Sequence, residues 1–145
     1  MAPGKKYGEE SVAVQSHLKI NQDVISRMAS NSSSCKAWCI TLVSAVLVIV
    51  ANKGKPNYAL IAAIPTILFL TLDAYYLALE KCFRASYNSF ITKLHSEEVD
   101  STDLFAVTPH GSVVRALCCS LLSFSIWPFY LTLGVMIAIA RWIVF

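Results

Sequence analysis

The sequence predicts an all-α integral membrane protein with about three transmembrane helices and an N-terminal cytoplasmic amphipathic helix, assembled as a homo-oligomer. Three observations lead to this prediction: an apolar composition, apolar residues gathered in long blocks, and helical spacing before the first block. Of the 145 residues, 56% are apolar and only 14% are charged, and the mean hydropathy is +0.57. A soluble catalytic domain is excluded, because the polar stretches are too short to bury a core of their own.

The N-terminal region predicts a helix with one apolar face. Residues 9–30 contain neither Pro nor Gly, and a seam recurs at alternating intervals of four and three residues, the heptad spacing of a coiled coil. The seam consists of Val14, Leu18, Asn21, Ile25 and Met28. We expect it to mediate self-association, with its lone Asn fixing the register; packing against the same chain is the alternative. The Ser and Asn residues at 30–34 favour a break after this helix.

Three apolar blocks follow, at 37–51, 58–79 and 117–140, and Asp73 is the only charged residue inside them. A helix needs about 20 apolar residues to cross roughly 30 Å of hydrocarbon, so the second and third blocks are long enough. The first block reaches this length only if it includes residues 32–36, with the ammonium group of Lys36 extending to the headgroups. Pro128 lies within the third block and predicts a kink or a re-entrant segment there.

Basic residues lie unequally on the two sides of these blocks. Nine Lys and Arg flank them on the side of the N-terminus, and three, Lys53, Lys55 and Arg141, flank them on the other. Because cytoplasmic flanks retain the excess of basic residues, we expect a multi-pass protein with its N-terminus in the cytoplasm. The five Cys residues then lie on the cytoplasmic side, where reduced thiols are expected and no spacing completes a metal site.

Asp73 is the strongest chemical anomaly, because a carboxylate within the membrane costs about 2.5 to 3.5 kcal/mol on insertion scales. Asp73 lies 16 residues after Asn57, and Lys36 lies 16 residues before Asn52. Antiparallel helices joined at this turn therefore place Lys36 and Asp73 at one depth. Three interpretations stay open: a structural Lys36–Asp73 pair, a ring of Asp73 carboxylates in an oligomeric pore, and burial at an interface with Tyr75 or Tyr76.

The pattern divides the chain into four parts. Residues 1–30 form the cytoplasmic helix, and residues 31–95 form a transmembrane hairpin whose second helix continues to His95 outside the membrane. Residues 96–112, rich in Ser, Thr and acidic side chains, form a linker. Residues 113–145 form a C-terminal transmembrane helix.

No enzymatic motif is present: the sequence lacks a Gly-rich phosphate loop, His-Glu-x-x-His and Gly-x-Ser-x-Gly. We therefore expect no catalytic residue, metal or cofactor. The N-terminal basic residues are either solvated surface or contacts to phosphates, of a nucleic acid or of anionic lipid. The candidate nucleic-acid contacts are Lys5, Lys6, His17, Lys19 and Arg27.

Three segments carry a resemblance: HLKINQDVISRMA at 17–29, KAW at 36–38 and LDAYYLALE at 72–80. They resemble small bacterial transmembrane effectors of anti-phage defence islands, and most of all the channel effectors of the Hailong system, over about residues 11–94. The resemblance implies a homo-oligomeric channel, such as a tetramer, in the bacterial inner membrane. It also implies that a DNA oligomer or nucleotide made by a partner nucleotidyltransferase keeps the channel closed, and that opening during infection depolarises the cell.

These features lead to a prediction and an alternative. The prediction is a ligand-gated oligomeric ion-channel effector of abortive infection, with Asp73 and Lys36 among the polar groups near its conduction path. The alternative is a non-conducting membrane scaffold that recruits a partner protein through its cytoplasmic helices.

Overall fold

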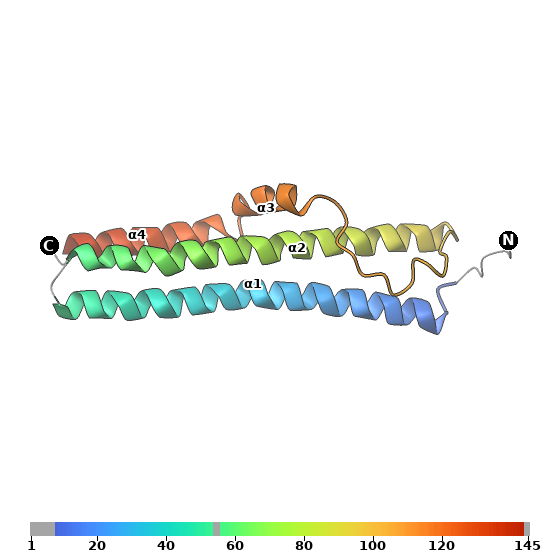
Figure 1. The fold of residues 1–145 in the computed structure, drawn as a ribbon, viewed down its shortest axis with the longest axis horizontal. Helices are drawn as coiled ribbons and strands as arrows, with labels where there is room; N and C mark the ends of the chain where they lie inside the picture. The colour runs from blue at the N-terminus through green and yellow to red at the C-terminus, as the bar shows by residue number, and fades with distance from the viewer. Residues whose placement is uncertain (1–7, 54–55, 144–145) are drawn as a thin grey trace.

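The structure is a computed structural model that describes residues 8–53 and 56–143. Its elements are α1 (Val12–Lys53), a 3-10 helix η1 (Pro56–Ala62), α2 (Ala63–His95), α3 (Val113–Leu121) and α4 (Trp127–Ile143). The described residues contain no β-strand, so the predicted all-α class is confirmed. α1 and α2 lie side by side as a long antiparallel hairpin, and α4 lies beside its turn end (Figure 1).

Both hairpin helices are longer than a membrane is thick. α1 has 42 residues, about 63 Å at a rise of about 1.5 Å per residue, and α2 has 33, about 50 Å. Each contains an apolar stretch of sufficient length and hydropathy to cross a membrane. A helix of either length that crosses a membrane projects beyond the hydrocarbon, which is roughly 30 Å thick. The predicted continuation of α2 to His95 is confirmed.

α1 runs without interruption through residues 30–34, so the break predicted there is wrong. Within this run Ser32 is buried against α2 and donates a hydrogen bond to Asp73. The hydroxyl therefore finds a tertiary partner, and it does not compete for the backbone groups of its own helix. Consequently the division between residues 30 and 31 is not a boundary of secondary structure.

The third apolar block does not form one continuous helix. α3 ends at Leu121 and α4 begins at Trp127, and a turn between them is closed by hydrogen bonds from the N–H groups of Ile126 and Trp127 to the carbonyl of Ser123. Pro128 is in the first turn of α4, where its missing N–H removes no helical hydrogen bond. α4 has 17 residues, about 25 Å, which is short for a full crossing. The described structure thus has two helices that could span a membrane, not three.

Buried apolar side chains form two clusters, one at each end of the hairpin. At the turn end, α4 packs into the hairpin, and the cluster comprises Cys39, Val43, Val50, Ala59, Ala62, Ala74, Ile126, Tyr130, Leu133 and Ile137. At the other end, which we call the polar end (residues 12–31 and 80–112), the cluster comprises Val14, Phe90, Leu94, Val99 and Leu104. Residues 96–112, predicted as a linker, therefore also cover the hairpin.

The seam predicted for self-association packs within the chain, which corrects that prediction. Val14 and Asn21 are buried, Leu18 packs against the polar-end cluster, and Ile25 and Met28 are half-buried. The same stripe continues along α1 toward the turn through Ser32, Cys35, Cys39 and Val43. The physical reason is that α2 extends as far as α1 does and offers its own apolar face at high local concentration.

Candidate functional site

The ion pair predicted between Lys36 and Asp73 is present at the α1–α2 interface. Lys36 Nζ lies 2.6 Å from Asp73 Oδ2, and the side chains are 21% and 0% exposed respectively. Ser32 donates a hydrogen bond to Asp73 Oδ1, and Lys36 Nζ donates one of 3.4 Å to Ser32 Oγ. The carboxylate is thereby neutralised within the apolar part of the hairpin.

α4 adds a third element to this pair. The Tyr130 side chain is buried in the turn-end cluster, which also contains Cys39 on α1 and Ala74, the residue after Asp73. Sequence reasoning did not assign Ser32 or Tyr130 to the site. Ser32 could have been found, because it continues the spacing of the seam beyond Met28 and lies one turn before Lys36, whereas the position of Tyr130 depends on how α4 packs.

In this conformation Asp73 does not face a water path. Its side chain is fully buried, and Tyr75, which is 43% exposed, makes its ring contact with Tyr76 at 5.9 Å. The partners of Asp73 are thus Lys36 and Ser32 on α1, as expected for a structural pair. A pore-lining role for Asp73 stays a prediction, and it would require the hairpin to open.

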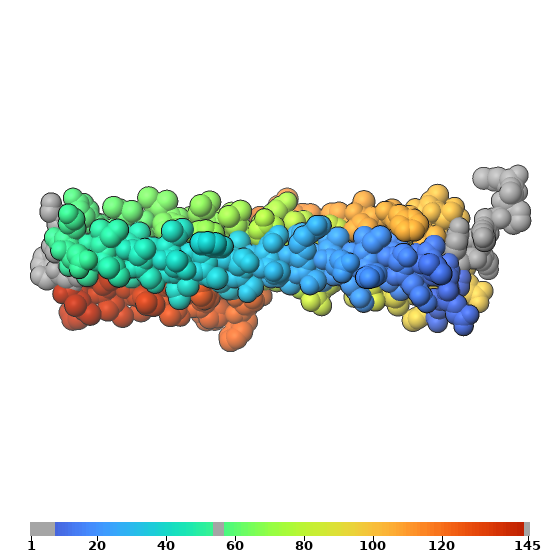
Figure 2. All heavy atoms as spheres, turned by 90° about the horizontal axis from the view of Figure 1, so that it is seen from below, coloured from blue at the N-terminus to red at the C-terminus, as the bar shows by residue number. Residues whose placement is uncertain are grey.

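The side of α1 that faces away from α2 carries a line of mostly small side chains, with the exposed Trp38, Ile40 and Ile49 beside it. We call this the small-residue face; its members recur at intervals of four and three residues, are all exposed, and are Ser30, Ser34, Ala37, Thr41, Ser44, Val48 and Ala51. Thr41 Oγ1 donates to the carbonyl of Ala37 at 2.8 Å, so its hydroxyl is satisfied within the helix. Figure 2 shows one side of α1 uncovered along its length. Small residues of this kind permit close helix–helix approach in membranes.

Sequence reasoning missed the small-residue face. Apolar periodicity identifies a face by its bulky side chains, and Ser, Thr and Ala at 30–51 give little contrast with their apolar neighbours. Only the structure shows that no other element of the described chain covers this face.

At the polar end, His17 is buried, and a polar group lies near each of its ring nitrogens. Nδ1 accepts a 2.9 Å hydrogen bond from the Phe105 N–H, and the Asn21 amide lies 2.8 Å from Nε2. The ring also contacts Phe90, with centroids 4.4 Å apart. Because Nδ1 accepts from a backbone N–H, it carries no proton, so the imidazole is neutral in this arrangement. His17 is therefore not available as a nucleic-acid contact, which corrects that assignment.

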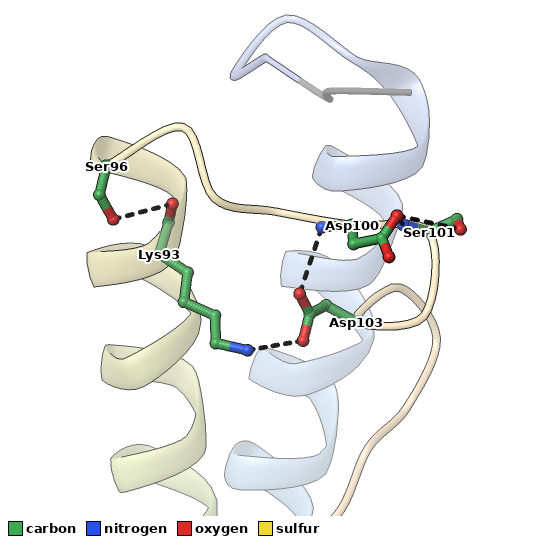
Figure 3. Close-up of polar contacts among 5 residues, drawn as sticks. All are labelled: Lys93, Ser96, Asp100, Ser101 and Asp103. Atoms are coloured by element: carbon green, nitrogen blue, oxygen red, sulfur yellow. Dashed lines mark hydrogen bonds and ion pairs between the residues drawn. The ribbon is translucent and has the colours of Figure 1, made fainter. Parts of the chain in front are cut away.

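The linker is fastened to the hairpin by polar contacts. Lys93 Nζ lies 2.7 Å from Asp103 Oδ1, and Asp103 Oδ2 accepts from the Asp100 N–H at 3.2 Å (Figure 3). The side-chain hydrogen bond between the two raises the pKa of Lys93 and lowers the pKa of Asp103. Further along the linker, Ser86 Oγ donates to the Thr108 carbonyl at 2.6 Å.

The remaining candidate nucleic-acid contacts are Lys5, Lys6, Lys19 and Arg27. Lys19 and Arg27 are exposed on α1. Lys5 and Lys6 lie outside the described residues. Within residues 8–53 and 56–143, no group of three or more His, Cys, Asp or Glu side chains is arranged to hold a metal ion.

The Lys36–Asp73 pair predicts a non-additive effect on stability. Lys36→Met leaves a buried unpaired carboxylate and should lower the free energy of unfolding by about 3 kcal/mol. Lys36→Met/Asp73→Asn should recover most of this loss, because no buried charge remains. Thermal unfolding in detergent measures the loss of stability in Lys36→Met, in Asp73→Asn and in the double variant. Lys53→Met is the control for an exposed lysine on the same helix. A double variant whose loss equals the sum of the two single losses would contradict the pairing.

The burial of His17 predicts that the linker loosens in acid. Burial lowers the pKa of His17 below its usual value of 6.5, and Asp103 partly opposes this shift. The unfolded or detached ring therefore takes up a proton before the packed ring does, so stability is complete above pH 6.5 and falls as the pH decreases below it. Hydrogen exchange of peptides covering 100–106, corrected for intrinsic rates, should accelerate on acidification in the wild type. This acceleration should be absent in His17→Gln and retained in the exposed control His95→Gln.

No family model matches this chain, and neither a curated protein nor a solved structure matches it.

Proposed function

We propose that this chain is the protomer of a ligand-gated, homo-oligomeric ion channel in a bacterial membrane, acting as an effector of anti-phage abortive infection. The observation that carries the channel proposal is the small-residue face of α1, which is exposed and continues from the polar end into the apolar stretch. The defence role is supported by the resemblance of segments 17–29, 36–38 and 72–80 to Hailong channel effectors.

Conduction requires several copies of the chain. In one copy the hairpin is closed on itself by the Lys36–Asp73 pair and the turn-end cluster, so a single chain has too few helices to enclose water. Copies arranged with their small-residue faces inward would place the hydroxyls of Ser34, Thr41 and Ser44 along a shared axis. Pores are commonly lined by such uncharged polar groups or by backbone oxygens.

The same helix connects this path to a ligand. Lys19 and Arg27 are exposed on the polar end of α1, and Arg27 lies one turn before Ser30 at the start of the small-residue face. A phosphate-bearing ligand bound there would act on a continuous helix of 42 residues. A ligand that prefers the closed assembly holds it closed, and loss of the ligand releases it. This matches the control by a DNA oligomer or nucleotide that the resemblance implies.

The channel is tested by changing the small-residue face. Expression in bacteria with a potential-sensitive dye should report depolarisation, and the purified chain in planar bilayers should conduct. Thr41→Leu/Ser44→Leu should lower conductance by an order of magnitude or more, because an apolar constriction excludes water. The control is Thr71→Leu on α2, a threonine that is also exposed and whose hydroxyl is likewise bound to its own helix. Native mass spectrometry should show the same oligomer for all three proteins.

Two outcomes separate the channel from the scaffold. Monomers in micelles and in bilayers, with no conductance in the presence or absence of nucleotides, would overturn the channel. Oligomers that never conduct but capture a cytoplasmic protein would instead favour the non-conducting scaffold.

The ligand assignment has its own test. Replacing Lys19 and Arg27 by Ala should weaken binding of a labelled short single-stranded DNA and reduce the slope of log affinity against log salt by about 1.4, at about 0.7 per phosphate contact. Lys53→Ala/Arg141→Ala removes two exposed basic residues at the opposite end of the molecule and serves as the control. An unchanged slope in the Lys19/Arg27 variant would show that these residues do not bind the ligand.

A further inference from the structure

A second basic feature lies between α2 and α3. A cavity of about 260 Å³ opens there, and its lining joins small side chains to basic ones. Ala85, Ala116, Cys82 and Cys119 provide the apolar walls, and the basic lining residues are Lys81, His110 and Arg115. The residues come from three parts of the chain: the middle of α2, the end of the linker and the start of α3.

Local hydrogen bonds fix this arrangement. The His110 N–H donates to the Cys82 carbonyl at 3.3 Å, which ties the end of the linker to α2. Ser112 then caps α3, its hydroxyl accepting from the Arg115 N–H at 3.4 Å. Lys81 and Arg115 therefore line one cavity although they are far apart in the sequence.

The charge of this cavity is unbalanced. Among the described residues that line it there is no Asp or Glu, and neither Lys81 nor Arg115 forms an ion pair within the described chain. The nearest acidic residue in the sequence, Glu80, is bound to Arg84 at 2.8 Å. Basic side chains that lack an internal partner and stand beside apolar walls suit an anion that carries an apolar part.

The position of the cavity indicates which anion that is. Lys81 follows the apolar block 58–79, and Arg115 precedes the block 117–140, so both lie at the predicted cytoplasmic boundary of the membrane. Immediately beyond α3, Leu122 and Phe124 are each 83% exposed. Bulky apolar side chains this exposed are suited to contact with acyl chains. Basic pockets between helices at the cytoplasmic boundary are known to bind anionic lipid headgroups.

We propose that this cavity binds the headgroup phosphate of an anionic phospholipid between Lys81 and Arg115, with the acyl chains along the exposed residues after α3. The proposal rests on the membrane location contained in the proposed function, and it does not depend on conduction. The bound lipid would hold α3 against α2 where the third apolar block is interrupted.

The experiment uses the full chain in zwitterionic micelles, titrated with phosphatidylglycerol or with phosphatidylcholine of the same acyl chains, and read by native mass spectrometry. We expect the wild type to prefer phosphatidylglycerol. Lys81→Gln and Arg115→Gln should each weaken phosphatidylglycerol binding about fivefold, and the double variant about 25-fold, since each basic residue near an anionic lipid contributes about 1 kcal/mol. Lys53→Gln/Arg141→Gln is the matched control and should bind as the wild type does.

Other results would overturn the proposal. Unchanged phosphatidylglycerol binding in the double variant would do so, and so would displacement of the lipid by inorganic phosphate or by a short oligonucleotide, which would assign the cavity to a soluble anion. Liposome flotation distinguishes this failure from that of the proposed function. A chain that does not float with liposomes lacks the membrane location and contradicts both proposals. A chain that floats but shows no lipid preference contradicts only this one. If the double variant unfolds, the charge-retaining Arg115→Lys and the two single variants decide the question.

Discussion

The burial of one carboxylate constrains the whole hairpin. Asp73 is fully enclosed by apolar structure, and a charge in that position requires a partner. Lys36 and Ser32 supply it from α1, so the pair sets the register of α1 against α2. A slip of one turn would remove Lys36 from Asp73. With this register fixed, Val14 on α1 meets Phe90 and Leu94 on α2 far from the pair, and the polar end closes as a consequence.

The same constraint leaves α1 with two unlike faces. One face is occupied by α2, by the ion pair and by the polar-end cluster. The opposite face holds small and hydroxyl-bearing residues that no described part of the chain covers. Since the internal face cannot serve a second copy without opening the hairpin, any assembly of closed protomers must use other surfaces, and the small-residue face is one that no described part of the chain covers.

The linker, residues 96–112, contacts both hairpin helices and joins them to α3. It is fastened to α1 at His17, through the Phe105 N–H, and to α2 at Lys93 and Ser86, and it ends where Ser112 begins α3. Phe105 has a φ of 64°, a left-handed conformation that costs about 1–2 kcal/mol for a residue other than glycine, so its hydrogen bond to His17 holds a conformation the backbone would otherwise leave. Protonation at His17 and lipid at Lys81 and Arg115 would therefore act on opposite ends of one segment.

Several features could be predicted from the sequence because they depend on local pattern. The apolar blocks and helical spacing predicted the all-α class and the end of α2 at His95, and counting residues from the turn placed Lys36 beside Asp73. Tertiary structure alone decided the rest. A heptad seam predicts that a face is buried but not which surface covers it. The sequence therefore could not decide whether Val14 and Asn21 pack against the same chain or against a second copy. Continuity of α1 through Ser32 depended on a hydroxyl meeting a carboxylate 41 positions away. The burial of His17 likewise depended on a backbone group 88 positions away. Periodicity is a property of neighbours in the chain, whereas the identity of a partner is a property of distant residues brought together.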